Sequence, residues 1–170
     1  MATRLGMKVG DIEHTVRGDM LTVGSKAPDF ILWTPRQAEK TLGDYAGKVK
    51  ILSVIPSIDT RVCSAQTRRF NEEAAALSDG IVVLTISADQ PFALGRYCEN
   101  EGIENTETLS TVRDMRFAED YGVHDVDWRV CQRAVFVVDK DDVIRYAEYV
   151  SVIGDEVDFN ATLETARALV

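Results

Sequence analysis

Two runs of apolar residues constrain the fold of this 170-residue chain more than any other feature. Residues 49–55 and 81–87 are each almost continuously hydrophobic and rich in β-branched side chains, which is typical of strands that helices cover on both faces. Between the two runs, apolar residues recur at helical spacing: Val62, Phe70, Ala74 and Leu77. The sequence therefore predicts two parallel strands joined by a right-handed helical crossover.

Further elements follow in an order that defines the fold class. A second helix is predicted to begin at Pro91, because proline is favoured at the first helical position, and to end at Gly102. Residues 134–138 and 143–150 are predicted strands, and because the turn between them is too short for a crossover, they must pair antiparallel. A last helix over 157–169 completes an α/β protein with a thioredoxin-like fold, in which helices flank a mixed central sheet.

The N-terminal part of the chain is predicted to form a β-hairpin ahead of this sheet. Three short β-prone pieces alternate with turn-forming pairs in this part: 14–17, 20–23 and 30–33, with Gly18-Asp19, Gly24-Ser25 and Pro28-Asp29. No repeat or linker interrupts the chain. We therefore expect one domain over residues 1–170, with residues 11–33 as a hairpin extension.

The charge and the cysteine content exclude several classes of protein. A net charge of −9 would repel nucleic acids and anionic membrane surfaces, so neither is an expected partner. Three cysteines are too few for a disulfide-stapled secreted fold, and an odd number leaves at least one thiol unpaired, which favours a reducing compartment. Without a signal peptide or a membrane-spanning run, the sequence predicts a soluble cytoplasmic protein.

Motifs for metals and cofactors are missing from the sequence. It contains no Cys-x-x-Cys pair, no glycine-rich phosphate loop and no dinucleotide fingerprint. His14 and His124 are the only histidines, and because neither stands near a cysteine pair, both are expected to be ordinary surface or loop residues. The sequence thus predicts no metal and no cofactor, which leaves thiol chemistry.

Cys63 is the residue whose position points most directly to chemistry. It lies between the carboxyl end of a predicted central strand and the start of the next helix, where ligand chemistry gathers in α/β proteins. If Thr60 is the N-cap, Cys63 occupies the third helical position, where free backbone N–H groups and the helix dipole favour a thiolate. Asp59 as the N-cap would place Cys63 one position deeper. The alternative is a small buried hydrophobic residue, the commonest fate of a lone intracellular cysteine.

The order of residues around Cys63 resembles a known signature. Pro56-x-x-x-Thr60-x-x-Cys63 is similar to the active-site motif of peroxiredoxins, and the stretch from Pro56 to Thr60 with Val62-Cys63 resembles the thiol peroxidase subfamily in particular. Other stretches resemble the same family in the same order: 24–30, 86–89 with 91–93, 108–110 and 133–139. The resemblance covers nearly the whole chain.

The resemblance implies roles for four residues. Cys63 would be the peroxidatic cysteine, whose thiolate attacks a hydroperoxide and becomes a sulfenic acid, a reaction for which an exposed sulfur is expected. Thr60 would offer its hydroxyl beside the thiolate, Arg133 would hold the thiolate and the peroxide, and Pro56 would shield the sulfur. The alternatives are a helix cap for Thr60, a strand-end ion pair for Arg133 and a strand terminator for Pro56.

Cys98 matches the resolving cysteine of thiol peroxidases, which forms a disulfide with the peroxidatic cysteine in the same chain. If Pro91 opens the helix, Cys98 lies about 10 Å along its axis, whereas a disulfide requires Cα atoms within about 7 Å. We therefore expect local unfolding around both cysteines when the bond forms. The alternative role for Cys98 is helix core.

Two residues depart from the pattern of the subfamily. Cys131 has no counterpart, and we favour an unreactive buried thiol over an alternative resolving cysteine. Arg61 stands where a small residue or proline is more usual; it would add a cation near Cys63 or narrow the path of the peroxide, and the alternative is a solvated surface arginine.

The resemblance further implies a thiol-dependent peroxidase that reduces hydrogen peroxide and organic hydroperoxides, uses thioredoxin as its reductant and forms a homodimer. The competing hypothesis is a thioredoxin-like relay or binding module, in which Cys63 senses peroxide and passes oxidation to a partner protein without efficient turnover.

Overall fold

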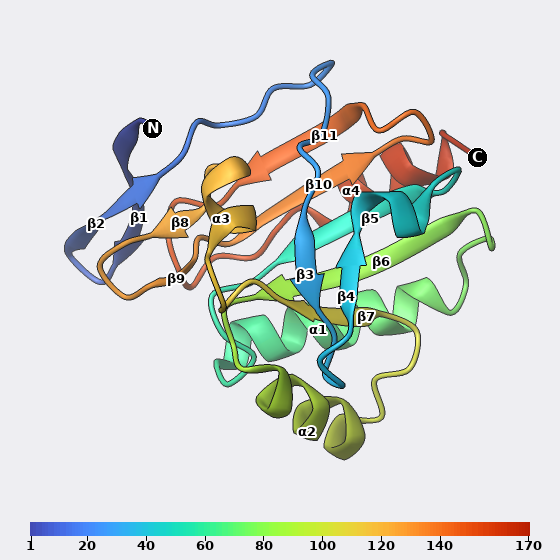
Figure 1. Cartoon of the computed structure of the whole chain (residues 1–170), viewed down its shortest axis with the longest axis horizontal. Helices are drawn as coiled ribbons and strands as arrows, with labels where there is room; N and C mark the ends of the chain where they lie inside the picture. Colours follow the sequence, from blue (N-terminus) through green and yellow to red (C-terminus); the bar gives the residue numbers. More distant parts are fainter.

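The computed structural model describes residues 1–170 as two β-sheets with helices packed around the larger one (Figure 1). The strand order of the seven-stranded sheet is β11-β10-β5-β6-β7-β3-β4. Its strands are β3 (Ile31–Trp33), β4 (Glu39–Thr41), β5 (Val49–Val54), β6 (Ile81–Ser87), β7 (Glu107–Ser110), β10 (Ala134–Val138) and β11 (Ile144–Tyr149). The helices are η1 (Leu42–Tyr45), α1 (Arg61–Ala74), α2 (Pro91–Glu101), α3 (Arg116–Asp120) and α4 (Phe159–Arg167). None of these helices combines the length and hydrophobicity that crossing a bilayer requires.

The pairing of the central strands confirms the mixed sheet predicted from the sequence. β5 and β6 run parallel and are joined by α1, whereas β10 pairs antiparallel with both β5 and β11. α2 begins at Pro91 and is capped at its C-terminus by Gly102, which adopts the left-handed conformation with a φ of 63°. This is the thioredoxin-like arrangement that the order of elements predicts.

Each face of the central sheet is covered by a separate apolar layer. Phe70 of α1 and Phe159 of α4 belong to the layer on one face, with their ring centroids 5.0 Å apart. The layer on the other face contains Phe117 of α3 and Tyr121, which stack with centroids 4.2 Å apart. Because both faces are covered, β5 is buried along its whole length, which explains the continuous apolar run.

The N-terminal hairpin exists, but its predicted boundaries are wrong. It consists of β1 (Thr3–Val9) and β2 (Ile12–Arg17), not of residues 11–33. Residues 20–23 form no strand; the backbone N–H of Leu21 donates to the Tyr149 hydroxyl, and the backbone N–H of Gly24 donates to the Ile144 carbonyl oxygen on β11. β3 pairs with β7 and β4 and so belongs to the central sheet.

A second, smaller sheet holds the hairpin and corrects the expectation for the histidines. It adds β8 (His124–Asp125) and β9 (Val130–Cys131) to β2. His14 is buried and its Nδ1 lies 2.9 Å from Oδ2 of the buried Asp125, while the ring of His124 is buried with its Nδ1 3.2 Å from a Glu119 carboxylate oxygen. Both histidines are therefore interior residues, which carboxylate partners make possible.

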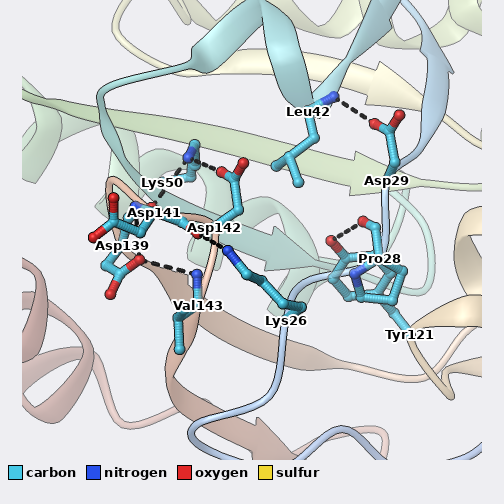
Figure 2. Close-up of polar contacts among 10 residues, drawn as sticks. All are labelled: Lys26, Pro28, Asp29, Leu42, Lys50, Tyr121, Asp139, Asp141, Asp142 and Val143. Carbon is cyan, nitrogen blue, oxygen red and sulfur yellow. Dashed lines mark hydrogen bonds and ion pairs between the residues drawn. The ribbon is translucent and has the colours of Figure 1, made fainter.

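Figure 2 shows the buried Lys50, which holds the β10–β11 turn. The turn lies at the start of β5, whereas Cys63 follows the end of that strand. Lys50 is 0% exposed, and its Nζ donates to the Asp139 carbonyl oxygen at 3.1 Å and to Oδ1 of Asp142 at 2.5 Å. Oδ1 of Asp139 accepts from the backbone N–H groups of Asp141 and Val143, each at 2.9 Å. The lysine thus carries a charge into the interior only because the turn supplies its partners.

This pair gives a stability prediction. Asp142→Asn should lower the free energy of unfolding by about 2 kcal/mol, less than is usual for a broken buried pair because the Asp142 side chain is 39% exposed. Lys50→Met should lower the free energy of unfolding by less, because it removes the buried charge itself and leaves only the half-exposed Asp142 without a partner. Urea unfolding of both variants checks the order, and a larger loss in Lys50→Met would contradict the account.

Candidate active site

Cys63 lies at the N-terminus of α1, directly after the loop that leaves β5. Thr60 is the N-cap in an extended conformation, and its Oγ1 accepts a hydrogen bond from the Cys63 backbone N–H at 3.3 Å. This places Cys63 at the third helical position and confirms Thr60 over Asp59 as the cap. Because Oγ1 accepts from the backbone, the Thr60 hydroxyl proton remains free to donate to another group.

The Cys63 side chain is 0% exposed, which corrects the expectation of an exposed sulfur. It packs with Ile55, Ile58 and Leu94, because helical side chains point back toward the N-terminus and here meet the β5–α1 loop. An open depression lies over the start of α1 and the segment after β11. It is lined by Arg61, Val62, Ala65, Gly154, Asp155 and Glu156.

Arg133 brings a buried cation to the sulfur. It stands directly before β10 and is 1% exposed, and its Nη2 lies 3.4 Å from Cys63 Sγ. The same nitrogen donates to the Ile153 carbonyl oxygen at 2.8 Å, and Nη1 donates to Gln66 Oε1 at 2.9 Å. The partners of Arg133 are thus a sulfur, an amide and a carbonyl, so the alternative of a strand-end ion pair with a carboxylate is wrong. The guanidinium therefore places a positive charge and an N–H donor directly at the Cys63 sulfur.

Gln66 and Ser53 position this arginine and were not found from the sequence. Gln66 is buried on α1, and while its oxygen accepts from Arg133, its Nε2 donates to Ser53 Oγ on β5 at 2.8 Å. One signal was available: Gln66 follows Cys63 by three residues, so it shares the inward face of the helix with the cysteine. A polar residue on that face indicates a buried partner.

Asp89 holds the loop that precedes Cys63, a role that the sequence does not predict. Its carboxylate accepts from Ser57 Oγ at 2.8 Å, from the Ile58 backbone N–H at 2.8 Å and from Ser87 Oγ at 2.6 Å. The loop, in which Pro56 is buried, is therefore tied to the end of β6. These bonds fix the backbone on which Thr60 and Cys63 are displayed.

Replacement of Asp89 tests this tie. Asp89→Asn keeps the size of the side chain but removes the charge and one acceptor, so the free energy of unfolding should fall by about 2 kcal/mol. The rate constant for reaction with peroxide should fall about tenfold, since the loop no longer holds the sulfur in place. Thermal unfolding and rapid-mixing kinetics measure the two effects. Asp44→Asn, at the cap of η1, is the control for losing a hydrogen-bonded carboxylate elsewhere.

The other two cysteines lie in different surroundings. Cys98 is half-buried on α2, its Sγ is 3.4 Å from Thr108 Oγ1, and burial raises the pKa of its thiol. Cys131 is 0% exposed on β9, and burial raises the pKa of its thiol strongly. The site brings together Cys63, Thr60 and Arg133, while Cys98 faces β7. All three thiols are free in this structure.

The fold and the buried cysteine at the start of α1 define the class: a thioredoxin-like protein with a thiol centre. The redoxin family model matches residues 22–163. A thiol peroxidase of Bacillus subtilis is 52% identical over 156 residues, which are 92% of this chain and 93% of that protein. A thiol peroxidase of Streptococcus pneumoniae is 49% identical over 169 residues, covering 99% of this chain and 100% of that one.

Solved structures agree with these relatives. The crystal structure of a peroxiredoxin-like protein from Aquifex aeolicus superposes with a TM-score of 0.90 at 31% identity and covers 99% of both chains. A thiol peroxidase from Chromobacterium violaceum, at 24% identity and a TM-score of 0.82, shares the fold over 94% of both chains. The chain belongs to the redoxin family, within its thiol peroxidase group.

Proposed function

We propose that this chain is a thiol-dependent peroxidase in which the Cys63 thiolate attacks a hydroperoxide. The observation that carries the proposal is the Arg133 guanidinium 3.4 Å from Cys63 Sγ, at the N-terminus of α1. In the reaction the sulfur forms a bond to one peroxide oxygen and the O–O bond breaks. The other oxygen leaves with the electron pair, takes a proton and becomes water or an alcohol. Cys63 becomes a sulfenic acid.

The surrounding residues supply what this step requires. Negative charge moves from the sulfur to the leaving oxygen, so fixed donors should lie on both sides of the reacting atoms. Arg133 would stabilise the thiolate and the developing charge, and the free hydroxyl proton of Thr60 would bind the peroxide. Pro56 would keep water from the sulfur. The depression lined by Arg61 and Val62, the two residues before Cys63, is the proposed entry route for the peroxide.

Cys98 is the proposed resolving residue. Its sulfur attacks the Cys63 sulfenic acid, an S–S bond forms, the S–O bond breaks and the oxygen leaves as water. Because Cys98 faces Thr108 on β7, α2 must unwind or turn locally before the two sulfurs meet. Cys131 would stay outside the cycle, since burial holds it as a thiol.

The proposal also names a reductant, an oligomeric state and a cellular compartment. Thioredoxin would reduce the disulfide by thiol exchange, and the protein would work as a homodimer; the family resemblance supports both. Phe92, 74% exposed on the first turn of α2, is an apolar side chain that a partner would cover. A reducing compartment such as the cytoplasm suits three free thiols.

A turnover assay tests this function against a redox relay. With thioredoxin, thioredoxin reductase and NADPH, the protein should consume many equivalents of hydrogen peroxide, whereas a relay would stop near one. Peptide mapping after one equivalent of peroxide should show a Cys63–Cys98 link within one chain. A link to Cys131 would overturn the assignment of the resolving cysteine.

A further inference from the structure

The residues next to the two reactive cysteines are hydrogen-bonded to each other. Tyr97, which precedes Cys98 on α2, has its hydroxyl oxygen 2.8 Å from Oγ of Ser64, which follows Cys63 on α1. The Tyr97 hydroxyl also donates to the Ser64 carbonyl oxygen at 3.2 Å, so Ser64 Oγ–H is the donor in the shorter contact. Ser64 Oγ in turn accepts from Arg68 at 2.6 Å. The first turn of α1 and the middle of α2 are thereby joined.

The ring of Tyr97 and the sulfur of Cys98 point in different directions. The ring packs against the cluster that contains Cys63 and Leu94, whereas Cys98 contacts Thr108 on β7. Successive residues of a helix are separated by about 100°, so both side chains cannot face α1 at once. Any movement that brings Cys98 to Cys63 must therefore remove Tyr97 from its position and break its bonds to Ser64.

We propose that the Tyr97 hydroxyl is a positioning group that holds α2 against α1 in the reduced protein and slows formation of the Cys63–Cys98 disulfide. The inference rests on the proposed function, because it assumes that Cys98 resolves the sulfenic acid. The Tyr97 hydroxyl is hydrogen-bonded to Ser64 and to neither sulfur, so it acts through the placement of α2.

This restraint sets the fate of the sulfenic acid. While α2 stays closed, a second hydroperoxide can transfer another oxygen to the Cys63 sulfur, which yields a sulfinic acid and releases water or an alcohol. Disulfide formation competes with this step by removing the sulfenic acid. A tighter bond between Tyr97 and Ser64 therefore makes Cys63 more sensitive to over-oxidation.

Tyr97→Phe is the direct test, because it keeps the ring in the apolar cluster and removes only the hydroxyl. After rapid mixing with one equivalent of hydrogen peroxide, quenching and mass spectrometry should show the disulfide forming about three- to tenfold faster, the range expected for one lost hydrogen bond. Sulfenic acid formation should stay within about twofold of the wild-type rate. At excess peroxide, the sulfinic fraction should fall.

Two further variants sharpen the result. Ser64→Ala removes one of the two contacts of the hydroxyl and should give a smaller acceleration. Tyr146→Phe removes a hydroxyl that donates to Glu148 at 2.9 Å on β11 and should leave all rates unchanged. Disulfide formation at or below the wild-type rate in Tyr97→Phe would overturn the inference while leaving the proposed function intact. Absence of a Cys63–Cys98 disulfide in the wild-type protein would overturn the inference together with the assignment of Cys98 as the resolving cysteine, whereas failure to consume peroxide would overturn the proposed function.

Discussion

Cys63→Ser is expected to lower hydroperoxide consumption by at least about a thousandfold, because the hydroxyl that replaces the thiol does not ionise at neutral pH and is a poor nucleophile toward a peroxide. Serine is nearly the same size and shape as cysteine, so the protein should remain folded. The measurement is the rate of peroxide loss in the thioredoxin-coupled assay, with circular dichroism as the check on folding.

Cys131→Ala is the matched control for the loss of a buried thiol. Cys131 is as buried as Cys63 but has no cation at its sulfur. The variant should lose some thermal stability, because a small cavity opens in the core, and should keep its peroxidase activity. Comparable activity loss in the Cys131 and Cys63 variants would contradict the proposed roles of both residues.

Arg133→Met is expected to lower the second-order rate constant for peroxide by about a hundredfold, the usual effect of removing a fixed donor from developing negative charge. Rapid-mixing kinetics at several peroxide concentrations measure this rate constant. Because Gln66 and the Ile153 carbonyl lose their partner, thermal stability should fall as well.

Arg133→Lys separates charge from geometry. A lysine keeps the cation but cannot donate to the sulfur, Gln66 and the Ile153 carbonyl from one planar group. The second-order rate constant of Arg133→Lys for peroxide should lie between those of Arg133→Met and the wild type. Full activity in Arg133→Met at neutral pH would show that the guanidinium has no part in the reaction.

Much of the fold can be predicted from the sequence because its strongest signals are local. The apolar runs of β5 and β6, the proline at the start of α2 and the short β10–β11 turn each identify an element without knowledge of the rest. The bounds of the β1–β2 hairpin are difficult to predict, because the outward-facing Leu5 and Ile12 blur the alternation of apolar and polar residues along its strands. Strands as short as β8 and β9 exist only through their pairing partners.

The site residues also fall into those that local sequence signals predict and those that depend on distant contacts. Thr60 and Cys63 are predictable because a helix cap acts over three residues, and Arg133 is reachable through the family resemblance. Gln66 and Asp89 cannot be predicted as site residues from the sequence, because their roles depend on contacts between distant segments. Gln66 accepts from Arg133, and Asp89 accepts from the loop before Cys63. The burial of the Cys63 sulfur is harder to predict because part of the cluster around it, Leu94 with Tyr97, is distant in sequence and belongs to α2.

The central claim is that Cys63 is the thiol that attacks the peroxide, and trapping its oxidised form tests this most directly. In a Cys98→Ser variant the sulfenic acid has no resolving partner, so it should persist long enough to react with dimedone. After one equivalent of hydrogen peroxide, mass spectrometry should find dimedone on Cys63 and none on Cys131. Label on Cys131 instead, or a Cys63 thiol that stays unmodified, would contradict the account.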